Sequence, residues 1–216
     1  MPRRTVWGVD SARRVTNNLY QCVVDNYGSP RFWGRYLQSI EGQTVELTQQ
    51  EVRFLHNKGI KILPIYLFQG ATGYRHGKVI AHNAVFTARR LGIPKGTFLF
   101  ADLERGMSVD EAWIRGYVDA MFPAGFRPGI YCDPTRSDFN RAYCTAVRNN
   151  SKVADQVVIW SQEPTPGVTK KRNAPKYNPA KPSCKANVWG WQYGENAPEC
   201  PIDTNLIDSR LLNNLY

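Results

Sequence analysis

Short apolar runs alternate along this chain with segments in which apolar residues recur every three or four positions. The runs predict strands over residues 5–9, 31–37, 61–68, 97–101, 127–132, 156–160 and 187–192, and an eighth near 202–206. The helical pattern covers residues 17–26, 48–57, 77–91, 108–122 and 135–148. Strands separated by helices pair in parallel through right-handed crossovers, which predicts an α/β fold. Eight strands favour a single (β/α)8-like TIM barrel, irregular in its last third, over an open doubly wound sheet.

Residues that begin and end helices lie where this pattern needs them. Thr48 precedes Glu51 by three positions, as in a capping box, and Gly59 follows that helix where a left-handed residue is favoured. Ser108 and Glu111 have the same spacing at the start of the fourth predicted helix. These signals support the alternation of strands and helices.

Length and composition indicate one domain. The chain has 216 residues, of which 42% are hydrophobic, enough for one substantial core, and it contains no linker-like stretch. We expect a single domain over residues 1–216, with a basic loop at about 164–186 as an insertion, and a monomer. Since no apolar run approaches the length of a membrane span, we expect no such span and an export signal that is missing or already removed.

The net charge of +10 predicts a surface that attracts anions. It does not choose between nucleic acid, anionic lipid and an acidic cell-wall polymer. Much of the charge lies in one stretch that contains proline and asparagine, at Lys170, Lys171, Arg172, Lys176, Lys181 and Lys185. This stretch is interpreted as a solvated loop or as a surface that holds an anionic polymer.

The five cysteines form no C-x-x-C pair and have no histidines at zinc spacing, so we expect no metal site and no cofactor. Disulfides between Cys184 and Cys200 and between Cys132 and Cys144 would each close a short segment. Buried free thiols are the alternative. Neither a phosphate-binding glycine-rich loop nor a G-x-S-x-G elbow is present, and the three histidines are interpreted as surface or packing residues.

The apolar run at 98–101 leads directly into two acids, Asp102 and Glu104, spaced so that a strand directs both to one face. The carboxyl ends of barrel strands are where catalytic groups gather, so this pair predicts acid/base chemistry on a polar substrate, with glycosidic bond cleavage favoured. Asp10 and Asp203 lie at other strand ends. The structural alternatives are a capping role for Asp10, a turn role for Asp203, and ion pairs of the acidic pair with Arg105 or Arg35.

The order of the motifs Gly-Val-Asp-Ser, Phe-Ala-Asp-Leu-Glu, Val-Ile-Trp, Trp-Gln-Tyr and Ile-Asp-Thr-Asn resembles that of the family 25 glycoside hydrolases, the Chalaropsis-type lysozymes. The chain resembles more closely their relatives, the glycoside-hydrolase-like proteins of domain of unknown function 1906. That closer resemblance rests on the phrases at 34–37, 63–66 and 91–94. It extends from about Trp7 to the last residue and implies a TIM barrel that acts on a glycan.

Carried over by position, the resemblance implies that Glu104 is the general acid. Asp102 would raise the proton affinity of Glu104 and orient the 2-acetamido group of the substrate. Asp10 and Asp203 would position water or bind the sugar. The implied substrate-binding residues are Tyr66, Trp160, Trp191, Gln192 and Tyr193. Two mechanisms stay open, assistance by the acetamido group and inversion with Asp203 as the base.

One departure from the lysozyme pattern follows Trp160. The chain continues Ser161-Gln162, whereas the lysozymes usually have a small residue and then an aromatic one at these positions. The wall of that part of the site is therefore expected to differ. The indole rings themselves have a structural alternative, because buried tryptophans more often fill cores than bind sugars.

The resemblance and the acids together predict a peptidoglycan N-acetylmuramidase-like glycosidase that is secreted or acts on the cell wall. The alternative is a catalytically weak or inactive carbohydrate-binding barrel with the same residues. A nucleic-acid partner would leave the clustered acids unexplained, because they repel phosphate. The expected partner is therefore peptidoglycan or a related amino-sugar glycan.

Overall fold

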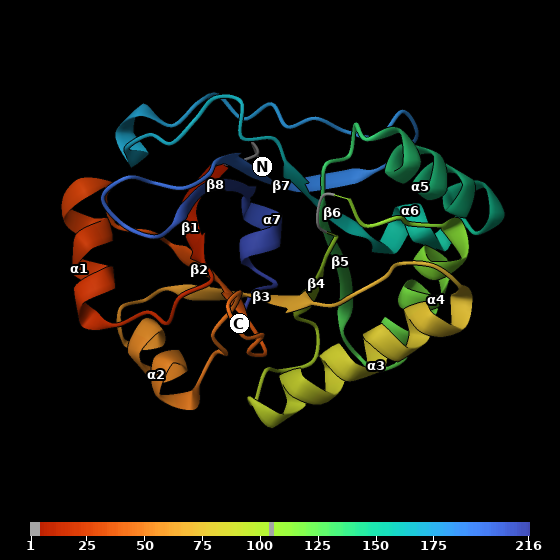
Figure 1. The fold of residues 1–216 in the computed structure, drawn as a ribbon, viewed down its shortest axis with the longest axis horizontal. Coiled ribbons are helices and arrows are strands. Elements are labelled where there is room, and N and C mark those ends of the chain that lie inside the picture. Colours follow the sequence, from red (N-terminus) through yellow and green to blue (C-terminus); the bar gives the residue numbers. More distant parts are fainter. Residues whose placement is uncertain (1–4, 104–105) are drawn as a thin grey trace.

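The computed structural model describes residues 5–103 and 106–216, whose strands close into one barrel in chain order (Figure 1). The strands are β1 (Thr5–Ser11), β2 (Phe32–Tyr36), β3 (Lys61–Leu67), β4 (Phe98–Asp102), β5 (Arg127–Cys132), β6 (Val158–Gln162), β7 (Asn187–Gly194) and β8 (Asp203–Asp208). The helices are α1 (Asn17–Asn26), α2 (Gln49–Asn57), α3 (Tyr74–Arg90), α4 (Glu111–Met121), α5 (Ser137–Asn149), α6 (Lys152–Gln156), α7 (Ser209–Leu212) and the short 3-10 helix η1 (Lys171–Asn173). The predicted TIM-barrel class is confirmed.

The last third of the barrel is irregular, as predicted. Each strand from β1 to β6 pairs in parallel with the next, but β8 runs antiparallel to both β7 and β1. Between β6 and β7 the basic stretch forms a long loop with η1 in place of a crossover helix. This loop is anchored to the barrel, since the backbone N–H of Lys171 donates to the carbonyl oxygen of Tyr27 over 2.8 Å.

Alternating strand residues separate an inner core from an outer one. Inside the barrel, large side chains from several strands pack together, and Leu211 and Leu215 close the end where the parallel strands begin. Glycines on neighbouring strands make room for these side chains. A Cβ atom on Gly129 would lie 2.6 Å from the Phe100 ring, and one on Gly190 would lie 2.9 Å from Trp160. The outer core fills the space between the strands and the helices.

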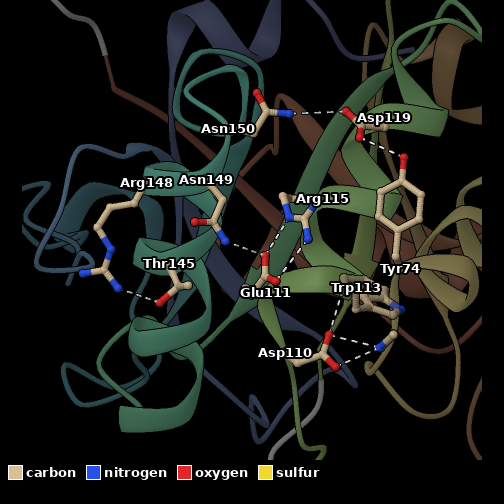
Figure 2. A network of polar contacts seen from close by, with 11 residues as sticks. Tyr74, Asp110, Glu111, Trp113, Arg115, Asp119, Thr145, Arg148, Asn149 and Asn150 are labelled. Atoms are coloured by element: carbon tan, nitrogen blue, oxygen red, sulfur yellow. Dashed lines mark hydrogen bonds and ion pairs between the residues drawn. The ribbon is translucent and has the colours of Figure 1, made fainter.

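Helices α3, α4 and α5 lie along one flank of the barrel and are joined by polar contacts (Figures 1 and 2). The N-cap of α4 is Asp110 rather than the predicted Ser108: its carboxylate accepts from Trp113 N at 2.7 Å and from Gly73 N. Asp119 accepts from the Tyr74 hydroxyl at 3.0 Å. Within the described ranges, no helix has the length and apolar character that crossing a membrane requires.

The contact between α3 and α4 requires two glycines. A Cβ atom on Gly77 would overlap the carbonyl oxygen of Trp113, and one on Gly116 would overlap that of Tyr74. We expect Gly77→Ala to lower the free energy of unfolding by about 2–3 kcal/mol, because the helices must move apart. Thermal unfolding should show a midpoint lower by about 5–10 °C. Asn83→Ala, an exposed change in the same helix, is the control and should leave the midpoint nearly unchanged.

The cysteine pairs differ from those considered above. Cys22 is bonded to Cys200 and Cys144 to Cys184, while Cys132 is a buried free thiol. The proposed pairs Cys184–Cys200 and Cys132–Cys144 are therefore wrong. The reason is that pairing follows spatial contact, and Cys200 lies against α1, a segment 178 residues away in the chain.

Arg35 forms an ion pair with Glu51 between the strands and the helices, and it does not pair with Asp102. Its Nε atom lies 2.6 Å from Glu51 Oε1, and both side chains are buried. Because Arg35 is adjacent in sequence to the inward-facing Gly34, it points to the helix side of the sheet, so its suggested pairing with Asp102 is wrong. Glu104 and Arg105 lie outside the described residues.

The predicted start of α2 is confirmed, since the Thr48 side chain accepts from Glu51 N, and Gly59 has the expected positive φ of 70°.

Candidate active site

A cavity of about 210 Å³ lies at the end of the barrel where the parallel strands finish. Asp10 and Asp102 reach it from the ends of β1 and β4. Asp203 reaches it from the start of β8, because that strand runs in the opposite direction. The lining residues are Asp10, Tyr36, Ile65, Asp102, Tyr131, Trp160, Gln162, Gln192, Glu195, Asn196 and Asp203. The structure thus brings three of the four predicted catalytic residues into one cavity, and the fourth, Glu104, is not among those it describes.

Asp10 and Asp203 are held side by side. They are direct partners in the register of β1 and β8. The Gln192 side-chain amide donates to Oδ2 of each carboxyl group at 3.2 Å, and Asn205 Nδ2 donates to Asp10 Oδ2 at 2.6 Å. The backbone N–H of Asn196 donates to Asp203 Oδ1 at 2.6 Å. The Gln192 amide therefore bridges two buried or nearly buried carboxyl groups.

This arrangement raises both pKa values. Burial raises the pKa of Asp10 to about 6, against hydrogen bonds from Asn205 and Gln192 that lower it, and the charges of Asp102 and Glu195 add to the rise. Burial also raises the pKa of Asp203 to about 8, with the charge of Asp10 as the next cause; the Asn196 N–H opposes the rise. The two groups titrate as a pair and together hold about one proton near neutral pH.

Asp102 lies at the end of β4 and is fully buried. The hydroxyl of Tyr36 donates to its Oδ2 atom over 3.0 Å. A carboxylate in this position is rigidly oriented toward the cavity, as a group that aligns a substrate must be. Tyr36 belongs to one of the phrases that carried the family resemblance, but its role as a partner of Asp102 was not predicted.

The predicted aromatic residues divide between the two faces of the sheet. Trp160 lines the cavity, and its Nε1 atom donates to Asn205 Oδ1 over 2.9 Å. Tyr66, Trp191 and Tyr193 belong instead to the outer core and are absent from the lining described for this cavity. Trp191 and Tyr193 flank the inward-facing Gln192, so strand alternation directs them to the helix side. The structure therefore does not bring these three rings to the cavity.

Four more residues line the cavity that were not predicted to bind substrate: Tyr131, Gln162, Glu195 and Asn196. Of these, the sequence pointed only to Gln162, as a departure from the lysozyme pattern. Tyr131 is the residue before the last one of β5, and a polar aromatic residue near the end of an apolar strand is a signal that the sequence does contain. Its hydroxyl donates to Gln192 Oε1 over 2.6 Å. Glu195 and Asn196 belong to the loop between β7 and β8, where no local pattern marks them. In the described parts of the chain, no three His, Cys, Asp or Glu side chains converge as metal ligands do.

The closed eight-stranded barrel, with carboxyl groups gathered at this rim, has the same fold as the family 25 lysozymes. Over residues 29–199 the sequence matches the model of the Rv2525c-like, glycoside hydrolase-like domain. The chain belongs to this family. The resemblance inferred from its motifs is confirmed.

Solved structures share this fold. An uncharacterized protein of B. stearothermophilus is 55% identical, with a TM-score of 0.96 over 98% of this chain and 100% of that one. The family 25 lysozyme of Aspergillus fumigatus is 15% identical, with a TM-score of 0.55 over 97% of this chain and 98% of that one. The autolysin LytC of Streptococcus pneumoniae, solved with a synthetic peptidoglycan ligand, is 14% identical, with a TM-score of 0.57 over 95% of this chain and 46% of LytC. No curated protein matches the sequence.

Proposed function

We propose that this protein is a glycoside hydrolase that cleaves the β-1,4 bond between N-acetylmuramic acid and N-acetylglucosamine in bacterial peptidoglycan. The observation that carries the proposal is the convergence of Asp10, Asp102 and Asp203 in one cavity at the barrel rim. Membership of a glycoside hydrolase-like family supports it. Glycosidases need carboxyl groups in different protonation states on either side of the scissile bond, and the cavity holds carboxyl groups with different environments.

In this proposal Glu104 is the general acid. Its proton passes to the glycosidic oxygen as the bond from that oxygen to the anomeric carbon breaks. A water oxygen later joins the same carbon and gives one proton back to the Glu104 carboxylate. Asp102, two positions earlier and fixed by Tyr36, orients the 2-acetamido group. Asp10, ionised above pH 6, stabilises the positive charge that develops on the sugar ring.

Between the two mechanisms, the environment of Asp203 supports acetamido assistance. A general base must be ionised to take a proton from water. The pKa of Asp203 lies near 8 because the group is buried beside Asp10, so most of it keeps its proton at neutral pH. Its role is then to donate and accept hydrogen bonds next to the sugar, with Gln192 as its partner.

We further propose that the protein acts outside the cytoplasm, at the cell wall. The two disulfides support this, because such bonds persist in oxidising compartments. The net charge of +10 supports it as well, since it favours adsorption to an acidic wall polymer.

The test is mass analysis of the products that purified peptidoglycan releases with the wild-type protein, Glu104→Gln and Asp102→Asn. We expect muropeptides with a reducing N-acetylmuramic acid end from the wild type, loss of release with Glu104→Gln, and a strong decrease with Asp102→Asn. Pelleting with the wall should persist in all three proteins. Wall binding without release by the wild type would contradict hydrolysis and favour the inactive carbohydrate-binding barrel.

A further inference from the structure

Hydrogen-bond donors and acceptors are unequally available in the cavity. Four buried donor groups among its described lining residues are each engaged with a protein acceptor. Tyr131 donates to Gln192, and Gln192 donates to Asp10 and Asp203. Trp160 donates to Asn205, and the Gln162 amide donates to Glu195 Oε1 over 2.9 Å. Apart from the proton that Asp203 keeps and the exposed side-chain amide of Asn196, the described lining therefore offers a ligand hydrogen-bond acceptors.

One of these acceptors has no protein partner. The side chain of Gln162 is on the lining of the cavity and is 8% exposed, and its Oε1 atom has no hydrogen bond. The contact with Glu195 fixes its orientation, because turning the amide over would set its oxygen against a carboxylate. A buried acceptor without a partner destabilises the protein until a donor reaches it. A ligand N–H or O–H group would supply that donor.

The charge around Gln162 has one sign. Asp10, Asp102, Glu195 and Asp203 line the cavity, and its described lining contains no lysine, arginine or histidine. A positively charged donor is favoured in such surroundings over a neutral one. Glu195 lies in the loop between β7 and β8 and is only partly buried, so its carboxylate is partly accessible to a ligand.

We infer that Gln162 and Glu195 bind the free 2-ammonium group of a de-N-acetylated glucosamine unit, next to the N-acetylmuramic acid unit at the cleavage position. An ammonium group has three donors and no acceptor, which matches Gln162 Oε1 and the Glu195 carboxylate. An acetamido group has one N–H and adds a carbonyl oxygen that finds the buried donors already engaged. The inference rests on the proposed function and adds a substrate preference to it.

The test uses one batch of peptidoglycan divided in two, one half fully N-acetylated with acetic anhydride and the other with its glucosamine units enzymatically de-N-acetylated. Pelleting affinity and release of reducing ends are measured for both at pH 6.5. We expect the wild type to prefer the free-amine glycan at least tenfold. Glu195→Gln and Gln162→Met should reduce the preference below threefold, while Glu46→Gln, the same charge loss at an exposed position outside the cavity lining, should keep it.

Two outcomes would overturn the inference in different ways. Equal or better binding and cleavage of the N-acetylated glycan by the wild type would overturn it and leave the proposed function standing. Failure to bind or cleave either glycan would overturn the proposed function and the inference together. The wild-type comparison decides the matter even if Gln162→Met does not fold.

Discussion

Asp10→Asn is expected to lower kcat on peptidoglycan at least a hundredfold at pH 7, whereas Asp203→Asn lowers it less than tenfold. The two carboxyl groups are neighbours, but at pH 7 the pKa near 6 leaves Asp10 mostly ionised and the pKa near 8 leaves Asp203 mostly protonated. An asparagine is a good mimic of the protonated group and a poor one of the ionised group. Loss of an electrostatic partner of the transition state costs about 10²–10³ in rate.

The pH profile of kcat/KM is the measurement that separates the two roles. For the wild type we expect the rate to rise through about pH 6, as Asp10 ionises, and to fall through about pH 8, as Asp203 ionises. Asp203→Asn should remove the alkaline limb. In Asp10→Asn the pKa of Asp203 should fall, because the charge of Asp10 helps to raise it. Equal losses of rate in both variants at pH 7 would contradict this division.

The same pair makes stability depend on pH. The folded-state pKa of Asp203 is about 8 and the ordinary value is 3.8, so the folded state holds the proton more tightly than the unfolded state. The contribution that protonated Asp203 makes to the free energy of unfolding is therefore fully present below pH 3.8 and is lost as the pH rises through about 8. Asp203→Asn removes this loss and should raise the free energy of unfolding at pH 9 by about 2–4 kcal/mol. Urea unfolding at pH 5 and pH 9 checks the sign.

Removing the Cys22–Cys200 disulfide with the double variant Cys22→Ser and Cys200→Ser should lower the free energy of unfolding by about 4–5 kcal/mol, since the bond closes a very long loop. The sequence separation is 178 residues. The bond also holds the loop between β7 and β8, whose Asn196 N–H donates to Asp203. Burial is the largest cause of the raised pKa of Asp203 and outweighs the opposing Asn196 hydrogen bond, so a loosened loop that admits water should move the alkaline limb of the rate profile downward.

The second disulfide provides a matched control. Cys144→Ser with Cys184→Ser opens a separation of 40 residues and should cost about 3–4 kcal/mol. It joins α5 to the basic loop, away from the lining of the cavity, so the pH profile should not move. Chemical unfolding and activity, measured at a temperature where both variants are folded, give the comparison. An unchanged alkaline limb in the Cys22 and Cys200 variant would contradict the coupling.

Local patterns explain why the barrel was predictable from the sequence. Apolar runs and helical periodicity are read within a few residues, and the turn glycine Gly59 has the positive φ that its position requires. Asp10, Asp102 and Asp203 were found by the same local logic, because each lies at or within one residue of the end of a strand. Strand alternation around Gln192 also contained the signal that Trp191 and Tyr193 face the helices.

Contacts between distant segments were not predictable in this way. The loop between β7 and β8 folds against α1, and this contact determines both the Cys22–Cys200 bond and the position of Glu195 and Asn196 at the cavity. The register shifts that β7 makes against β6 and β8 are likewise set by packing with the neighbouring strands. The hydrogen-bond partners of Gln162 depend on all of these placements together, and no short stretch of the sequence contains them.

The reversed direction of β8 determines where the last residue, Tyr216, lies relative to the cavity, and so where a fusion partner or a solid support can be joined. The chain returns through β8 to the end of the barrel opposite the cavity, where Tyr216 exchanges backbone hydrogen bonds with Ile62 and Leu215 lies in the inner core. β1 also begins at that end, since Thr5 is paired with Asp208. A fusion partner or solid support joined at Tyr216 would therefore leave the cavity pointing away from the point of attachment, free to meet an insoluble polymer.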